Sequence, residues 1–246
     1  MSLRLLPRVS LRSPPVSGSI FYNCRAEDLG DSYQREPLYF ASMSKRREPR
    51  WLDYYKATSK RPPYETLQKA LSSFDAEPSR KKMRFAIDLG CGGGRDTSEL
   101  LRRGWKVLAV DSEAGAIRWI RSNVSPTHRE QLRTRVTSFE RLSLPRCDLV
   151  NASYSLPFCS PKRFHSFWRK IVTSIRTGGR FSGHFFGVHD DWARSSNGTF
   201  HTAKQVKALL RPFEIEFFLE QEKDDRPALH ERRKHWHVFS VVARKR

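Results

Sequence analysis

Hydrophobic residues follow two alternating patterns along residues 64–244 of this chain. Short apolar runs, such as residues 85–87 and 107–110, have the composition of buried strands. Between such runs, apolar side chains recur every three or four positions, which is the spacing of one face of a helix. Strands that alternate with helices in this way predict an α/β fold built on a mostly parallel sheet.

The same pattern sets the order of the expected elements. We expect helices at residues 64–74, 95–103, 113–123, 161–176 and 202–210. Pro161 opens the fourth of these helices, an apolar stripe runs along it from Phe164 to Ile175, and Gly178 and Gly179 end it. We expect strands at residues 85–88, 107–111, 132–137, 146–152, 180–186, 212–222 and 235–244. Residues 189–200 are polar and predict a loop.

The length and charge of the chain limit its organisation and its partners. At 246 residues the chain suits one α/β domain with an extension. It has 46 Lys and Arg against 26 Asp and Glu, which gives a formal net charge of +20. This balance favours an anionic partner such as nucleic acid. The alternative is a solvated basic surface, and the spread of the basic residues along the whole chain favours that alternative.

The cysteines carry no metal or redox signature. Cys24, Cys91, Cys147 and Cys159 are scattered, and none belongs to a C-x-x-C pair. We therefore expect reduced thiols in a cytoplasmic protein. No apolar run approaches the roughly 18 residues of a membrane span, so we expect no membrane partner.

Residues 1–50 lack the patterns of the rest of the chain. The first 23 residues contain three arginines, several serines and prolines, and no acidic residue. Such a composition is typical of a transit peptide. A disordered tail, or a true start at Met43, explains the same residues. We predict a disordered basic extension at residues 1–50 and one domain at residues 51–246.

Near the start of this domain, Tyr54 and Tyr55 either line a substrate site or pack a helix onto the sheet.

The richest stretch for chemistry is residues 85–112, which predict a strand, a glycine-rich turn, a helix and a second strand. Glycines let the backbone approach a ligand closely, and the N–H groups that open the helix point toward it. Asp111 ends the second strand, where an acid can accept hydrogen bonds from a ribose. The dinucleotide pattern G-x-G-x-x-G fails because its last position is Arg95, and no P-loop Gly-Lys-Ser/Thr follows. Asp88, at the end of the first strand, suits a ligand with an ammonium group and no phosphate.

Residues 88–94 read DLGCGGG and closely resemble the D-L-G-C-G-x-G motif of class I S-adenosylmethionine (AdoMet) methyltransferases. The resemblance covers about residues 50–246. The phrases NASYSLPF, FSGHFFG and KHWHVF are similar to those of bacterial enzymes related to the tellurite-resistance methyltransferases. The resemblance to class I methyltransferases implies a Rossmann-like three-layer α/β/α sandwich. The sheet would have seven strands, six of them parallel, with an antiparallel C-terminal hairpin.

The resemblance also implies a cofactor site for AdoMet. Its residues would be Asp88, Gly90, Cys91, Gly92, Gly93, Asp111, Ser112, Phe139, Glu140 and Asn151. In this arrangement the backbone of Gly90 and Gly92 lies alongside the carboxypropyl group of AdoMet, and Asp88 lies near its ammonium. Phe139 stacks on the adenine, and Glu140 binds its amino group.

Catalysis would be an in-line displacement at the sulfonium methyl, in which alignment supplies much of the rate. Tyr154 and His184 are the candidate catalytic residues, and packing is the alternative role for each. An aromatic face at Tyr154 would stabilise the sulfonium cation. His235 and His237 share one face of a predicted strand, but the sequence shows no third ligand, so we expect no metal.

Three functions fit these observations. The first is a methyltransferase that acts on a small molecule such as a chalcogen oxyanion, a thiol or a metabolite. The second is an RNA or DNA methyltransferase, which the charge of +20 favours and the absence of an N-P-P-Y sequence disfavours. The third is a module that binds AdoMet or nucleic acid without turnover. We expect a monomer or a weak dimer.

Overall fold

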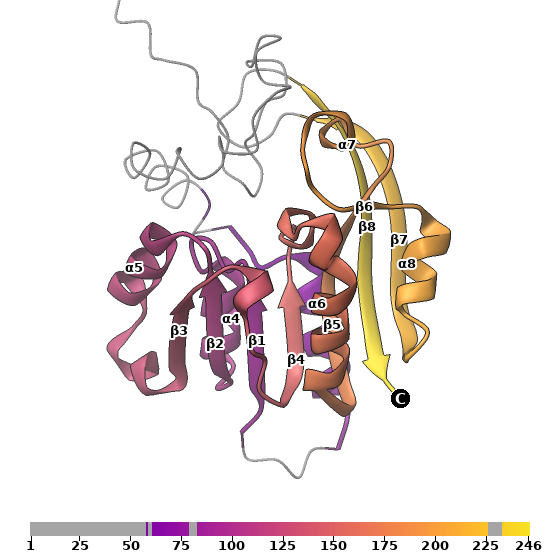
Figure 1. The fold of residues 1–246 in the computed structure, drawn as a ribbon. Helices are drawn as coiled ribbons and strands as arrows, with labels where there is room; N and C mark the ends of the chain where they lie inside the picture. Colours follow the sequence, from indigo (N-terminus) through magenta and orange to yellow (C-terminus); the bar gives the residue numbers. More distant parts are fainter. Residues whose placement is uncertain (1–57, 59–60, 79–82, 226–232) are drawn as a thin grey trace, which may run out of the picture.

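The computed structural model describes residues 58, 61–78, 83–225 and 233–246 (Figure 1). The predicted extension at residues 1–50, with Cys24, and the pair Tyr54 and Tyr55 lie outside these residues. The three described cysteines are free and buried. None of the helices in the described ranges has the length and apolar character needed to span a bilayer.

One sheet of eight strands forms the middle of the molecule. Along the sheet the order is β3-β2-β1-β4-β5-β8-β7, and β6 pairs with β5. The strands are β1 (Phe85–Leu89), β2 (Lys106–Asp111), β3 (Leu132–Val136), β4 (Cys147–Ala152), β5 (Ile175–Gly187), β6 (Phe200–His201), β7 (Phe213–Asp225) and β8 (Lys234–Lys245). Strands β1 to β5 pair in parallel, whereas β8 runs antiparallel to both β5 and β7.

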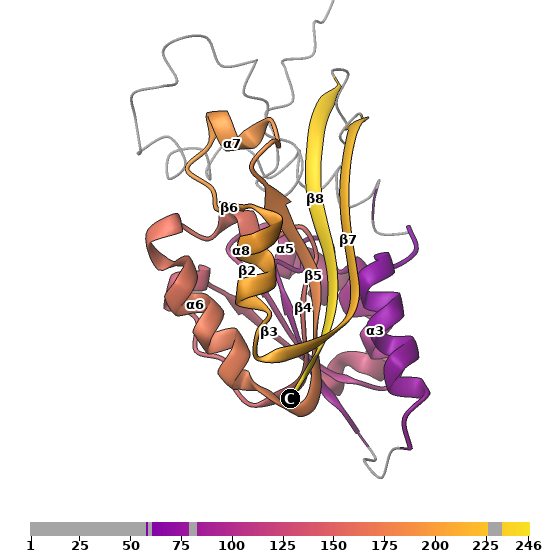
Figure 2. The same ribbon diagram turned by 90° about the vertical axis from the view of Figure 1, so that its right-hand side faces the viewer.

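Helices cover both faces of the sheet (Figure 2). The helices of the described residues are α3 (Glu65–Asp75), α4 (Arg95–Arg102), α5 (Ala114–Asn123), α6 (Pro161–Ser174), α7 (Trp192–Ser195) and α8 (Ala203–Leu209). Short 3₁₀ turns are η3 (Pro126–Gln131), η4 (Phe139–Arg141) and η5 (Leu156–Phe158).

Alternate side chains of the strands divide the core into two layers. On one face, Leu67 of α3 and Leu100 of α4 pack in the same cluster as Val107 of β2. On the other face, Phe164 of α6 and Val206 of α8 belong to the cluster that includes Val110 and Phe181. This confirms the predicted α/β/α sandwich with a mostly parallel sheet and an antiparallel C-terminal hairpin.

The structure departs from the predicted pattern where α6 meets β5. The helix ends at Ser174, and the strand begins at Ile175. Gly178 and Gly179 therefore lie inside the strand and do not end the helix. Gly178 has φ 78°, and a Cβ on Gly179 would lie 2.6 Å from the carbonyl oxygen of Asp148. The two glycines thus mark an irregularity where two backbones approach closely, and the register between β4 and β5 shifts there.

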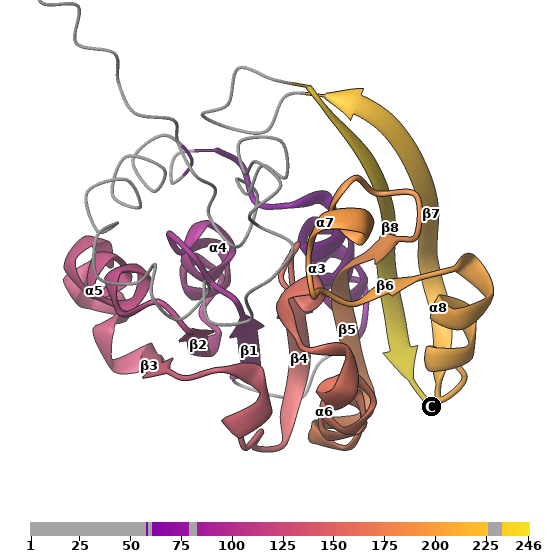
Figure 3. The same cartoon turned by 45° about the horizontal axis from the view of Figure 1, so that its top comes forward.

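Two further differences concern the end of the sheet where the parallel strands terminate. The stretch predicted as a loop at residues 189–200 contains α7 and ends in β6, which adds an eighth strand. The hairpin of β7 and β8 is longer than predicted. Its pairing continues to Asp225 and Lys234, whereas the pairing of β8 with β5 begins only at Val238. The hairpin consequently extends past β5, on the side where α7 lies (Figure 3).

Candidate active site

The glycine-rich turn joins β1 to α4 at the carboxyl end of the sheet. The N–H groups of Gly90 and Cys91 donate to the carbonyl oxygen of Val110, at 2.8 and 3.0 Å, and tie the turn to β2. Gly94 has φ 82°, and a Cβ there would lie 2.7 Å from Cγ1 of Ile120. Gly92 has φ 49° but faces open space. The turn is therefore anchored at both ends and open in its middle.

A pocket opens beside this turn. Its lining comprises Thr58, Tyr64, Asp88, Gly90, Cys91, Gly92, Gly93, Arg95, Asp96 and Ser153. Five of the ten predicted cofactor residues are in this set. The other five, Asp111, Ser112, Phe139, Glu140 and Asn151, lie outside the lining.

A buried network of polar side chains forms the floor of the pocket. Asp88 and Asp96 are only 2% and 4% exposed. The Asn151 side-chain amide donates to both carboxylates, at 2.9 Å in each case. Thr97 donates to Asp88 at 2.6 Å, and Ser153 donates to Asp96 at 2.6 Å. Although Asn151 does not line the pocket, it holds the two acids that do.

Burial of two neighbouring carboxylates has an electrostatic consequence. Desolvation is the larger cause that raises the pKa of Asp88, to about 7, and the charge of Asp96 is the second. Thr97 and Asn151 donate to the carboxylate and oppose the rise. Two buried acids favour a bound proton or a bound cation, and an ammonium group is one such cation.

Asp111 supports the turn from the end of β2. Its two carboxylate oxygens accept hydrogen bonds from the N–H groups of Gly92 and Glu113, both at 2.9 Å. The side chain is 1% exposed, and burial raises its pKa to about 7. Each oxygen keeps a second acceptor site, because a carboxylate offers about four. The neighbouring Ser112 is exposed.

Phe139 and Glu140 lie on the α6 side of the sheet. The ring of Phe139 stacks on Phe167 with centroids 4.9 Å apart, and Phe139 is 8% exposed. Glu140 is half-buried and accepts from the N–H of Ser160 at 3.4 Å. The structure does not place this pair in the lining of the pocket, and their role at the adenine stays a prediction.

The two candidate catalytic side chains lie together. The rings of Tyr154 and His184 stack with centroids 3.9 Å apart, and Tyr64 lies 5.1 Å from Tyr154 and 5.7 Å from His184. Tyr154 is the only non-glycine residue with positive φ (52°) in the described part of the chain, which is a strained backbone typical of functional sites. Strand β5 and the turn after β4 thus bring together residues that are 30 positions apart.

Burial keeps both of these side chains neutral. Desolvation is the main cause that lowers the pKa of His184, to about 3, and the charge of Arg95 adds to it. Burial also raises the pKa of Tyr154 above its ordinary value. Nδ1 of His184 has no hydrogen-bond partner among the described residues. Tyr154 and His184 lie outside the described lining, so at neutral pH they form a pair of neutral rings beside Tyr64 of the pocket.

The sequence prediction missed several residues of this site. Arg95 and Asp96 directly follow the glycines and occupy the first turn of α4. An acid in the first turn of a helix is a recognisable signal, because it interacts favourably with the helix dipole. Tyr64 lies under the guanidinium of Arg95, whose Cζ is 3.9 Å from the ring centroid. No local signal could place Tyr64 in the pocket, since it lies 24 residues before Asp88.

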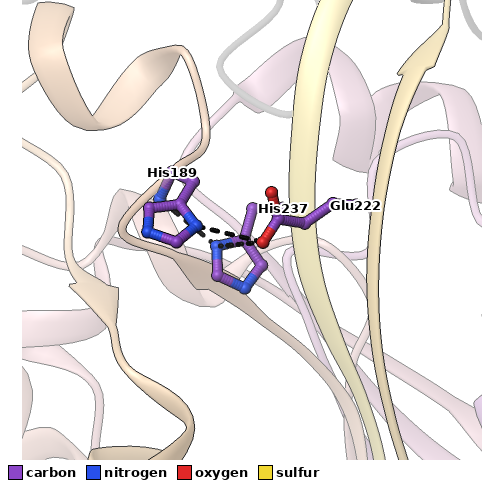
Figure 4. Close-up of side chains that lie close together, drawn as sticks. All are labelled: His189, Glu222 and His237. Carbon is purple, nitrogen blue, oxygen red and sulfur yellow. Dashed lines mark hydrogen bonds and ion pairs between the residues drawn. The ribbon is translucent and has the colours of Figure 1, made fainter.

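A second group of polar side chains lies on the projecting hairpin (Figure 4). His189, Glu222 and His237 each present a ligand-type atom, and these atoms lie within 4.8 Å of one another. The sequence had singled out His235 and His237 and found no third ligand. In the structure His235 pairs with Glu222 and Asp224, at 3.0 and 2.9 Å.

Comparison with known proteins agrees with the fold and the turn. Residues 86–179 match a family model described as a methyltransferase domain. No curated protein matches the chain. The crystal structure of TehB from Haemophilus influenzae is similar, with a TM-score of 0.63 and 16% identity, over 80% of this chain and 67% of TehB.

Two further solved structures share the fold. One is a TehB-like SAM-dependent methyltransferase from Corynebacterium glutamicum, with a TM-score of 0.54 and 16% identity, over 84% of this chain and 100% of that chain. The other is the 1,6-didemethyltoxoflavin-N1-methyltransferase of Burkholderia thailandensis, with bound 1,6-didemethyltoxoflavin and S-adenosylhomocysteine. Its TM-score is 0.54 and its identity is 20%, over 86% of this chain and 91% of that chain.

Proposed function

We propose that this chain is a class I AdoMet-dependent methyltransferase with AdoMet as its cofactor, and that its methyl acceptor is a small molecule. The observation that carries the proposal is the aromatic cluster of Tyr64, which lines the pocket, with Tyr154 and His184 packed beside it; the three rings lie 3.9 to 5.7 Å apart. Among the described residues that line the pocket, Arg95 is the only cationic one. Such a lining suits a compact acceptor better than a polyanionic backbone, which needs several cationic contacts.

We propose that the cofactor lies along the glycine-rich turn. The carboxypropyl group of AdoMet would lie alongside the backbone of residues 90–93, because three of these four residues are glycines, and a backbone without Cβ atoms permits close approach. Asp88, with Asp96 behind it, would bind the ammonium. The negative floor of the pocket supports this placement, since a bound cation offsets the burial of two acids.

The remaining predicted residues would bind the nucleoside. Asp111 would accept hydrogen bonds from the ribose hydroxyls with the acceptor sites that Gly92 and Glu113 leave open. Ser112, Phe139 and Glu140 would contact the nucleoside farther along the sheet. Asn151 would act through Asp88 and Asp96 as a positioning residue.

The neutral rings of Tyr154 and His184 also favour one class of acceptor. His184 is a poor general base because its pKa is lowered to about 3, and a raised pKa keeps Tyr154 protonated. An acceptor that is already an anion or a soft nucleophile, such as a chalcogen oxyanion or a thiolate, needs no base. Tyr154 and His184 would then align the acceptor with the sulfonium methyl and exclude water. The donor is already activated, so alignment and desolvation would supply much of the rate.

The first experiment measures methyl transfer from labelled AdoMet. Tellurite, selenite, small thiols and nitrogen heterocycles form one panel, and total tRNA and duplex DNA form the other. We expect turnover with at least one small acceptor and none with nucleic acid. Transfer to RNA or DNA alone, with an affinity for nucleic acid that falls steeply as the salt concentration rises, would refute the small-molecule proposal. It would favour the RNA or DNA methyltransferase that the net charge of +20 suggests.

The cofactor site is tested separately by calorimetric titration of AdoMet. Asp111→Ala should weaken binding by about 1–3 kcal/mol, because it removes hydrogen bonds to a charged group. Glu214→Ala is the control, since Glu214 is an exposed acid on β7 outside the pocket lining. Equal affinity of the Asp111 variant and the control would refute the assignment of Asp111.

A further inference from the structure

We propose that His189, Glu222 and His237 form a binding site for a transition-metal ion of the Zn²⁺ type. The three residues come from three segments that meet only in the folded chain. Glu222 of β7 and His237 of β8 are directly paired across the hairpin, and His189 lies two residues after the end of β5 (Figure 4). The site does not depend on the proposed acceptor, because it lies outside the pocket lining.

The spacing of the ligand atoms fits a metal ion. Nδ1 of His189 lies 3.0 Å from Oε1 of Glu222, and Nδ1 of His237 lies 3.8 Å from the same oxygen. All three atoms lie within 4.8 Å of one another. Ligands at about 2.1 Å from a tetrahedral Zn²⁺ are about 3.4 Å apart. The observed distances lie on both sides of this value, so small side-chain movements would complete the coordination.

The three side chains differ in how far they are exposed to solvent. The side chain of His237 is 3% exposed, so packing holds it in place. The side chains of His189 and Glu222 are 63% and 41% exposed, and they can rotate without disturbing the core. Their exposure also leaves room for water at a fourth coordination position. A buried anchor with two adjustable ligands is able to adapt to an ion.

The hydrogen bond on the far side of His237 orients its ring. Nε2 of His237 lies 3.0 Å from Oε1 of Glu220. A carboxylate at this position holds the proton on Nε2 and directs the lone pair of Nδ1 toward the site, as in the carboxylate–histidine pairs of many zinc sites. Nδ1 accepts the N–H of His189 at 3.2 Å, and a metal ion would replace this bond. The freed N–H is the backbone group of an exposed residue, so water can replace Nδ1 as its acceptor.

The local charge also favours a cation. Glu220, Glu222 and Asp224 alternate along one face of β7, within a chain whose formal net charge is +20. Two neutral imidazoles and one carboxylate leave one positive charge on a divalent ion, and the neighbouring carboxylates of Glu220 and Asp224 would stabilise that charge. The competing interpretation is a set of histidine–carboxylate hydrogen bonds without metal, which includes the pairs of His235 with Glu222 and Asp224.

Calorimetric titration of Zn²⁺ into the full chain, free of purification tags and treated with a chelator, separates the two interpretations. We expect one ion per chain with a micromolar or lower Kd. Glu222→Gln and His189→Ala should each weaken binding by at least about 10-fold, and Glu220→Gln by about 10- to 100-fold, because it removes the carboxylate that orients the ring of His237. Glu222→Gln and His189→Ala both change exposed side chains, so the fold should survive. His165→Ala is the control, because His165 is exposed on α6 outside the group.

A second readout uses Co²⁺ in place of Zn²⁺. The visible absorption of bound Co²⁺ reports its coordination, and we expect a tetrahedral spectrum that Glu222→Gln abolishes and His165→Ala leaves unchanged. No binding of Zn²⁺ by the wild-type chain would overturn the proposal and leave only the hydrogen-bonded cluster. Equal Zn²⁺ affinity in the wild type, His189→Ala and Glu222→Gln would overturn it as well, by placing the ion elsewhere.

Discussion

Asp88 should destabilise the free protein at neutral and alkaline pH. Its side chain is 2% exposed, and burial and Asp96 raise its pKa from 3.8 to about 7. A carboxyl group whose folded pKa is above its unfolded pKa binds its proton more tightly in the folded state. Its contribution therefore favours folding at low pH, and that contribution is lost as the pH rises from about 4 to about 7.

Replacing Asp88 with asparagine removes this penalty and keeps the shape of the side chain. The asparagine oxygen can accept from Asn151 or from the backbone N–H of Thr97, and its amide can donate to the hydroxyl of Thr97, which can reverse its direction. The difference between a pKa of 3.8 and a pKa of about 7 corresponds to about 4 kcal/mol. We expect Asp88→Asn to be more stable than the wild type by about 2–4 kcal/mol at pH 8, and by less at pH 5, where the native carboxyl is protonated.

The assay is urea unfolding of both proteins at pH 5 and pH 8 in the absence of AdoMet. Calorimetry should show that the more stable variant binds AdoMet at least about 10-fold more weakly, because a neutral amide cannot pair with the ammonium. Asp75→Asn is the matched control, since Asp75 is 63% exposed and pairs with Arg103 at the surface. A variant that is less stable than the wild type at pH 8, or whose gain is equal at both pH values, would refute the reasoning.

Two further predictions concern stability. Gly94→Ala should lower the free energy of unfolding in urea by about 2–3 kcal/mol, because φ is 82° and the new Cβ would overlap Ile120. Gly104→Ala is the control and should lower it by only about 1–2 kcal/mol, because φ is 78° but no atom lies within 4 Å of the new Cβ. Equal losses in the two variants would contradict the overlap with Ile120. Lys234→Met should lower the free energy of unfolding by about 3–5 kcal/mol in a thermal unfolding experiment. It leaves the buried carboxylate of Asp190 without its cationic partner, the Lys234 ammonium at 2.5 Å. Adding Asp190→Asn should recover much of that loss, and an unchanged melting temperature in the single variant would contradict the role of the ion pair.

Local patterns predicted the fold well where one segment decides its own structure. Alternating strand and helix spacings located β1 to β4 within a few residues, and the glycine run marked a turn whose φ values are positive at Gly90, Gly92 and Gly94. The same reasoning was wrong at Gly178 and Gly179. Two glycines after an apolar stripe predict the end of a helix, but the need of β5 to cross close to β4 explains them better.

The sequence by itself determined which residues supply the turn and its acids, because glycine conformation and strand periodicity depend on near neighbours. Only the tertiary structure decided which distant side chains meet. Asn151 contacts Asp96 across 55 positions, and His237 contacts His189 across 48, because strand order brings β4 beside β1 and β8 beside β5. The pairing of strands is a property of the whole sheet, so the buried acid pair and the histidine–glutamate group became visible only after folding.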